Sequence, residues 1–154
     1  MNKSPTLFVM IGPAGSGKST FRKSIPWACT VCPDTIRETF FGDEACQKEP
    51  EKVFERAYVT TEDLLCAGYD IVFDATNTTS YARKKLLERV SGIDHKNVAI
   101  FMNTPLKECK RRNALRKRKV PEEVIERQYE QMMRGAHSIP EQFDEIVIVE
   151  GWRK

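Results

Sequence analysis

The chain changes abruptly from an apolar run to a glycine-rich loop near its start, and this change constrains the fold more than any other feature. Residues 7–11 are apolar, and residues 12–19, GPAGSGKS, match the pattern G-x-x-x-x-G-K-[ST]. Glycines let backbone N–H groups turn inward without Cβ clashes and form a nest around a phosphate. We therefore expect a strand, a phosphate-binding loop and a helix, with a nucleoside triphosphate as the ligand. A glycine-rich turn that binds nothing is the simpler alternative.

Each part of this loop has an expected role toward the ligand. Lys18 would reach the β and γ phosphates, and the Ser19 hydroxyl is a hard oxygen suited to a Mg²⁺ that bridges two phosphate oxygens. ATP and Mg²⁺ are therefore the expected cofactors. The residues expected to contact ATP are Gly12, Pro13, Ala14, Gly15, Ser16, Gly17, Lys18, Ser19 and Thr20, with Asn77 from further along the chain.

Strand-like and helix-like runs alternate along the whole chain, which predicts an α/β fold. The runs expected as strands are short and mostly apolar, as in a parallel sheet that is buried on both faces. They cover residues 6–11, 27–31, 69–74, 97–102 and 145–149. We expect a single domain over residues 1–154, with a central parallel sheet of four to five strands flanked by helices.

Several residues mark the expected helix ends. Thr104 is the expected N-cap of one helix, with Pro105 at its first position. Asp34 is the expected N-cap of another, with Arg37 on a neighbouring face of the first turn. An apolar stripe over about residues 50–67 predicts a helix that packs on the core.

Polar residues follow the expected strands, at the sheet edge where open α/β folds bind their ligands. Asp34 and Arg37 are candidates for phosphoryl transfer, the alternative being a helix cap beside an exposed arginine. Asp74 ends a strand and is the expected carboxylate for a magnesium-bound water, although acids in this position also form turns. Asn77 would either bond a ligand or fix its own loop.

Residues 107–119 hold the cationic character of the chain. This segment has eight basic side chains and one acidic one, so it carries +7, and the rest of the chain carries −4 of the net +3. Such asymmetry favours phosphates as partners, although a solvated basic helix is the alternative. Arg112 and Arg116 are four residues apart, which predicts that both lie on one helix face and can close on transferring phosphates.

Composition argues against several other classes of protein. The five cysteines are an odd number in a chain without a recognisable export signal, so we expect reduced thiols in the cytoplasm. Cys29 and Cys32 form the one C-x-x-C pair, and without a second ligand pair we expect both to be structural. No segment approaches the ~20 apolar residues of a membrane span, so no membrane partner is expected. Motifs typical of GTPase switches are absent.

Taken together, these motifs resemble the kinase domain of phage-type and bacterial 5′-polynucleotide kinases, over nearly the whole chain. The matching set is GPAGSGKST, Asp34-x-x-Arg37, Asp-Ala-Thr-Asn at 74–77 with Arg83 beyond it, and Arg-Asn-x-x-Arg at 112–116. The resemblance implies that Asp34 is the general base toward a 5′-hydroxyl and that Arg37 contacts the phosphate of the acceptor. It also implies a P-loop kinase domain with a basic helical lid, in which Arg112 and Arg116 grip the ATP phosphates.

The resemblance implies an ATP-dependent transfer of the γ-phosphate to the 5′-hydroxyl of a polynucleotide, with nucleic acid ends as the substrate. Two alternatives stay open. Related small kinases with the same Asp-Ala-Thr-Asn pattern act on other hydroxyls, so a small-molecule kinase is one. A nucleic-acid-binding ATPase that transfers phosphate only to water is the other. Nothing in the sequence matches an Asp-x-Asp-x-Thr phosphatase motif.

Overall fold

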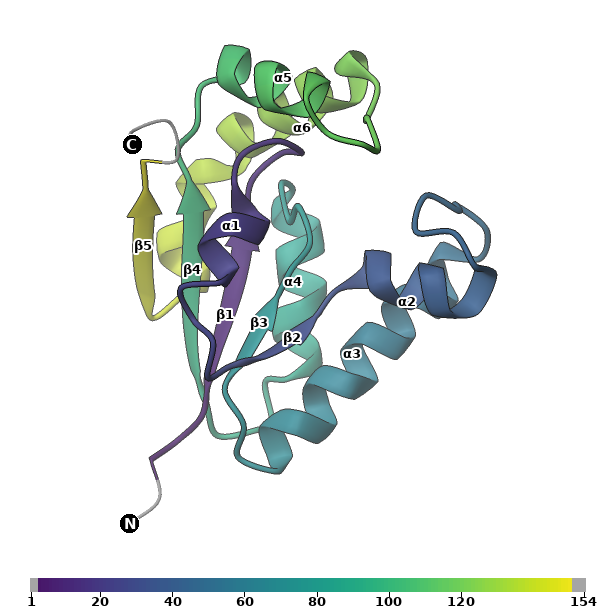
Figure 1. Cartoon of the computed structure of the whole chain (residues 1–154). Helices are drawn as coiled ribbons and strands as arrows, with labels where there is room; N and C mark the ends of the chain where they lie inside the picture. The colour runs from purple at the N-terminus through teal and green to yellow at the C-terminus, as the bar shows by residue number, and fades with distance from the viewer. Residues whose placement is uncertain (1–2, 151–154) are drawn as a thin grey trace.

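The computed structural model describes residues 3–150 and shows an α/β fold (Figure 1). Within these residues, five strands form one parallel sheet in the order β2-β3-β1-β4-β5, which confirms the predicted fold class. The strands are β1 (Thr6–Ile11), β2 (Cys29–Val31), β3 (Ile71–Phe73), β4 (Lys96–Met102) and β5 (Glu145–Val149). The predicted domain ends, at residues 1 and 154, lie outside the described residues.

Helices connect the strands and cover the sheet. They are α1 (Lys18–Arg22), α2 (Pro33–Phe41), α3 (Pro50–Cys66), α4 (Ser80–Arg89), α5 (Leu106–Ala114), α6 (Glu122–Gly135), η1 (Ala136–Ser138) and α7 (Ile139–Gln142). Figure 1 shows α1 on one face of the sheet, α3 and α4 on the other, and α5 beyond the carboxyl ends of the strands. The basic segment therefore lies over the edge where the phosphate-binding loop emerges.

Two apolar cores, one on each face, hold the sheet. Leu7 and Val9 of β1 belong to the core under α3 and α4, which includes Leu86. Met10, whose side chain points to the other face, packs with Ile25 in the smaller core on the α1 side. Burial on both faces explains why the strands are continuous apolar runs rather than alternating ones.

The topology places the phosphate-binding loop at the centre of the sheet edge. β1 lies between β3 and β4, while the chain leaves β1 for the outer strand β2 and later crosses from β3 to β4. Connections that run in opposite directions from a strand leave a crevice at its carboxyl end, which is the usual ligand position in open sheets. The loop from Gly12 to Gly17 occupies this position.

Two predicted helix caps are wrong. α2 begins at Pro33 with Cys32 as N-cap, because Cys32 is extended (φ −131°, ψ 116°) and the fixed φ of proline suits the first helical position. Asp34 therefore lies inside the first turn and its side chain does not cap the helix. In α5 the N-cap is Pro105, and the hydroxyl of Thr104 instead donates to the backbone oxygen of Ser16 at 2.8 Å.

Two strands are shorter than predicted. β2 begins at Cys29 rather than residue 27, because Trp27 and Ala28 belong to a turn in which the Ala28 N–H donates to Ile25. Trp27 is 65 % exposed. β3 covers Ile71–Phe73 within the predicted 69–74. The predicted helix over residues 50–67 is confirmed as α3, Pro50–Cys66.

Candidate active site

The phosphate-binding loop depends on its glycines for both conformation and packing. Gly15 and Gly17 have left-handed backbones, with φ of 82° and 99°, which side chains with a Cβ rarely adopt. A Cβ at Gly15 would overlap the backbone oxygen of Cys109, and one at Gly12 would overlap the Ser16 hydroxyl. The loop is therefore pressed against α5, and its concave side keeps the backbone amides free of Cβ atoms, as a phosphate requires.

Lys18 folds back over the loop. Its ammonium donates to the backbone oxygens of Gly12 and Pro13, both at 2.9 Å. Burial lowers the pKa of Lys18 to about 8; the charge of Asp74 raises that pKa and the charge of Arg116 lowers it further. A poorly solvated ammonium at the mouth of an amide nest is suited to an incoming phosphate, whose charge would replace the lost hydration.

The predicted magnesium residues, Ser19 and Asp74, both lie near this lysine. Ser19 is exposed in the first turn of α1, next to the exposed Thr20. Asp74 follows β3 and is 7 % exposed; burial raises its pKa, while the charges of Lys18 and Arg22 oppose that shift. Oδ2 of Asp74 accepts from Arg22 at 2.8 Å, and Oδ1 has no hydrogen bond within residues 3–150.

These residues fit a magnesium ion that is held mainly by phosphates and water. Among the described residues no group of three or more His, Cys, Asp or Glu side chains forms a metal cage. Mg²⁺ in nucleotide sites does not need one, because it keeps several waters and takes one or two protein oxygens. Ser19 and Asp74 would supply a hydroxyl and a carboxylate. Their binding of magnesium stays a prediction.

Asn77 is tied to its own loop. Its backbone is left-handed, with φ of 47°. The side-chain amide donates to the backbone oxygen of Met10 at 2.8 Å and of Ala75 at 3.3 Å, and its own backbone oxygen accepts from Arg83 at 2.9 Å. These contacts favour the loop-fixing role over the ligand-bonding one, and contact with ATP stays a prediction.

Asp34 and Arg37 lie together near the start of α2. Arg37 Nη1 lies 2.5 Å from Asp34 Oδ1, and the Arg37 guanidinium lies over the Phe54 ring, with Cζ 5.8 Å from the centroid. Arg118, from the loop between α5 and α6, lies 3.4 Å from the other carboxylate oxygen of Asp34 and 2.7 Å from Glu44. The pair expected from sequence is therefore brought together, and a third cation joins it.

The two predicted lid arginines are placed differently from each other. Arg112, on α5, lies against the phosphate-binding loop: its Nη1 donates to the Ser16 backbone oxygen at 3.4 Å, and its Nε donates to Glu108. Arg116 lies beyond the helix, which ends at Ala114, so the prediction that both share one helix face is wrong. The loop after the helix still keeps the charge of Arg116 within reach of Lys18.

Helix α6 supplies contacts that sequence reasoning missed. The N–H of Ala14 in the phosphate-binding loop donates to the Gln128 side chain at 2.9 Å, and the Thr78 hydroxyl donates to Gln131 at 3.0 Å. The two glutamines are three residues apart, so they lie on neighbouring positions of one helix face. That spacing is the only local signal, and it does not say what the glutamines face.

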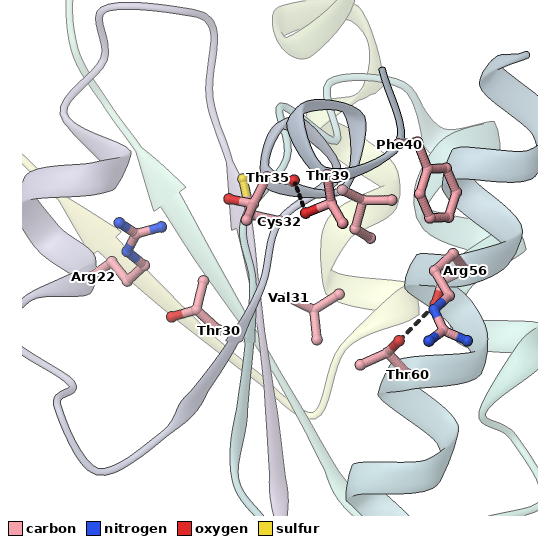
Figure 2. A pocket seen from close by; sticks show the side chains of 10 residues that line it. Arg22, Thr30, Val31, Cys32, Thr35, Thr39, Phe40, Arg56 and Thr60 are labelled. Atoms are coloured by element: carbon pink, nitrogen blue, oxygen red, sulfur yellow. Dashed lines mark hydrogen bonds between the residues drawn. The ribbon is translucent and has the colours of Figure 1, made fainter. Parts of the chain in front are cut away.

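A pocket lies on the opposite face of α2 from Asp34 and Arg37. It is a concavity of about 530 Å³. Figure 2 shows Arg22 and Arg56 on opposite sides of this pocket, with Val31 between them. Thr35 and Thr39 line it, and by helix geometry they face away from Asp34. This pocket is therefore distinct from the phosphate-binding crevice.

The cysteines are free thiols. Cys29 and Cys32 are half-buried at β2 and at the start of α2, and burial raises the pKa of Cys32. Cys109 is buried beside the loop, and burial raises its pKa to about 11. A raised pKa means little thiolate near neutral pH, as expected for structural thiols. In the part of the chain that the structure describes, no helix is long and apolar enough to cross a membrane.

Comparison with known proteins agrees with this arrangement. A family model described as "AAA domain" (AAA_33) matches residues 7–138, which include the phosphate-binding loop, Asp34, Asp74 and the basic segment. The L-seryl-tRNA(Sec) kinase of Methanococcus maripaludis is 30% identical over 135 residues, covering 80% of this chain and 51% of that protein.

Solved structures share the fold. A chain of the Pnkp1/Rnl/Hen1 RNA repair complex matches with a TM-score of 0.81 and 20% identity, over 90% of this chain and 47% of the other. A gluconokinase from Sinorhizobium meliloti 1021 matches with a TM-score of 0.61 and 18% identity, over 99% and 86%. The chain thus spans about half the length of the curated relative and of the RNA repair protein.

Proposed function

This chain belongs to the AAA domain family that its residues 7–138 match, and from that premise we propose that it is an ATP-dependent kinase that phosphorylates the 5′-hydroxyl of a polynucleotide. The coarser part of the proposal, a P-loop phosphotransferase, rests on the loop, Lys18 and the fold. The finer part, the nucleic acid acceptor, rests on the residues that face the loop across the crevice.

One observation carries the acceptor assignment: a carboxylate and a guanidinium are held together opposite the phosphate-binding loop. Asp34 and Arg37 are joined at 2.5 Å on the first turns of α2, and the charge of Asp34 acts on Lys18. A polynucleotide end presents a hydroxyl close to a phosphodiester, so it needs both a base and a cation. The curated relative supports a hydroxyl attached to RNA, since its name says that it acts on a seryl-tRNA.

The residues divide the reaction between them. Asp34 accepts the proton of the 5′-hydroxyl while the hydroxyl oxygen forms a bond to the γ-phosphorus and the bond to the β-phosphate oxygen breaks, leaving ADP. Lys18 and the loop amides hold the donor phosphates, and Arg112 and Arg116 neutralise charge as it moves. Magnesium, held by Ser19 and through water by Asp74, would supply further charge neutralisation. Arg37 orients the acceptor through its phosphate.

Labelled ATP tests the proposal directly. The protein is incubated with γ-labelled ATP, magnesium and separate pools of 5′-hydroxyl DNA, 5′-hydroxyl RNA and small metabolites. Label in an oligonucleotide pool is the expected result. Label only in metabolites would favour a small-molecule kinase, as in the gluconokinase that shares the fold. Phosphate release without a labelled acceptor would favour a nucleic-acid-binding ATPase.

A single substitution tests the acceptor side. Arg37→Ala should raise KM for an oligonucleotide, with a loss of about 2 kcal/mol typical of a charged hydrogen bond, and leave KM for ATP unchanged. Arg37→Lys should restore part of the loss, because it keeps the charge and loses the planar fork. If Arg37→Ala weakens ATP instead, Arg37 belongs to the donor site and the polynucleotide assignment loses its main support.

A further inference from the structure

Arg118 lies in the loop between α5 and α6 and reaches across the crevice to the acceptor side. Its Nη2 is 3.4 Å from Asp34 Oδ2, and its Nε forms an ion pair with Glu44 at 2.7 Å that lacks hydrogen-bond geometry. We propose that Arg118 is a specificity-determining residue that binds a phosphate of the acceptor beside the reacting hydroxyl, and that Glu44 holds it in place until the acceptor arrives. This inference rests on the proposed kinase function and names the acceptor class that the site requires.

Two guanidiniums crowd the carboxylate of Asp34. Arg37 lies at Oδ1 of Asp34 and Arg118 lies at Oδ2, so both oxygens face a guanidinium. A hydroxyl that gives its proton to Asp34 must approach one of these oxygens. Arg118 makes the longer contact, at 3.4 Å, whereas Arg37 is also held over the Phe54 ring. Arg118 is therefore the cation that an acceptor hydroxyl would displace.

Once displaced from Asp34, the guanidinium of Arg118 needs a new partner for its outer nitrogen. Arg118 keeps Glu44 as a partner, but its outer nitrogen has lost a carboxylate oxygen. A phosphate attached next to the reacting hydroxyl brings an oxygen to the same place, and guanidinium binds phosphate oxygens with its planar fork of donors. One third of the Arg118 side chain is exposed, so a ligand can reach it.

The charges around Asp34 are balanced before an acceptor binds. At rest, the guanidiniums of Arg37 and Arg118 are matched by the carboxylates of Asp34 and Glu44. An acceptor with a hydroxyl and no phosphate would separate Arg118 from Asp34 without supplying another anion for Arg118. Sites built around a polar partner discriminate strongly against ligands that lack it. Arg118 thus favours nucleoside 3′-phosphates and polynucleotide ends over free sugars and nucleosides.

Kinetics with a minimal acceptor pair test this role. Thymidine 3′-phosphate carries the hydroxyl and the phosphate, and thymidine carries the hydroxyl alone. Arg118→Ala should raise KM for thymidine 3′-phosphate by roughly tenfold or more, the scale of a hydrogen bond between charged groups, with KM for ATP unchanged within about twofold. KM for thymidine should not rise. Arg118→Lys should recover part of the loss, and Lys84→Ala, at an exposed position of α4, should change neither KM.

The variant Glu44→Gln distinguishes phosphate binding by Arg118 from a purely structural role of the Arg118–Glu44 pair. If Arg118 binds the acceptor, Glu44 competes with the phosphate, so Glu44→Gln should lower KM for thymidine 3′-phosphate. If the pair only ties two loops together, Glu44→Gln and Arg118→Ala should raise KM alike, and the inference is overturned. A rise in KM for ATP alone with Arg118→Ala would assign Arg118 to the donor and would also overturn it.

A binding measurement keeps this inference separate from the proposed function. Calorimetry of thymidine 3′-phosphate with the unaltered chain and with Arg118→Ala needs no phosphate transfer. If the unaltered chain transfers phosphate only to water, the kinase proposal fails, yet weaker binding by Arg118→Ala would still support Arg118 as a phosphate ligand. Equal binding by the two proteins, both shown to be folded by thermal denaturation, would refute the role of Arg118 whatever the activity.

Discussion

Asp34 does not cap helix α2, and its carboxylate is therefore free to make other contacts. Because Cys32 is the N-cap, both carboxylate oxygens of Asp34 remain available to Arg37, Arg118 and an acceptor. Asp34→Asn should reduce turnover by about 10² or more, the usual scale of general-base catalysis, while ATP affinity is preserved. Steady-state kinetics and ATP binding by calorimetry measure the two effects. A variant with near-normal turnover would exclude Asp34 as the base.

Lys18 predicts a dependence of ATP affinity on pH. Burial lowers its pKa from 10.5 to about 8. Between pH 8 and 10.5 the unfolded chain binds more protons than the folded one at this residue, so Lys18 makes the fold more stable as pH rises through that window. Bound phosphates need the protonated form. ATP affinity should therefore fall above pH 8. At pH 9 it should be roughly tenfold weaker than at a pH well below 8, where Lys18 is fully protonated.

Calorimetry in buffers of different ionisation enthalpy measures both the affinity and the proton uptake that this prediction requires. The neutral variant Lys18→Met should bind ATP weakly at every pH, with no such fall between pH 8 and 9. Cys109, with a pKa of about 11, is outside the window. Constant affinity of the unaltered chain up to pH 9 would contradict the prediction.

At the scale of elements, a buried arginine joins α4 to the end of α6. Arg83 is 0 % exposed, and its guanidinium donates to the backbone oxygens of Asn77 and Gly135 and to the side chains of Ser138 and Gln142. These partners come from the loop after β3, α6, η1 and α7. Burial lowers the pKa of Arg83, and acceptors on several elements replace the water that its guanidinium has lost.

Arg83→Met should destabilise the fold by about 3 kcal/mol or more, because it keeps the apolar stem and removes four hydrogen bonds to buried and half-buried acceptors. Urea unfolding followed by circular dichroism measures the free energy of unfolding. Lys84→Met, at the exposed neighbouring position of α4, is the matched control and should change it by less than about 0.5 kcal/mol. Equal midpoints for the two variants would show that Arg83 does not hold these elements together.

At the scale of the whole molecule, the positive charge of residues 107–119 is concentrated over the crevice, against a negative remainder. Lys117 and Lys119 are exposed in the loop between α5 and α6. If they contact a single-stranded oligonucleotide, replacing both by glutamine should reduce the slope of log affinity against log salt by about 1.4, since each phosphate contact contributes about 0.7. Fluorescence anisotropy at several salt concentrations measures this slope.

The control for this measurement is Lys84→Gln, an exposed lysine on α4, which should leave the slope unchanged. ATP affinity should change less than oligonucleotide affinity in the double variant, because the donor contacts are assigned to Lys18 and the arginines. If the slope is the same with and without Lys117 and Lys119, the loop between α5 and α6 does not contact the nucleic acid backbone.

Sequence alone predicted three features, namely the strands, the phosphate-binding loop and the pairing of Asp34 with Arg37, because each depends on residues close together in the chain. Apolar runs, glycine positions and an i,i+3 spacing need no knowledge of distant partners. The same reasoning placed Arg112 and Arg116 on one helix face and was wrong, since the helix ends at Ala114. Periodicity gives the type of an element more securely than its last residue.

The contacts between distant side chains at the crevice could be found only in the folded chain. Arg118 reaches Asp34 across 84 positions of the chain, and Gln128 reaches the Ala14 amide across 114. These contacts exist because the order β2-β3-β1-β4-β5 brings the carboxyl ends of β1, β2 and β3 to one edge and sets the lid above it. No local pattern specifies that order, which is fixed by the joint burial of both sheet faces.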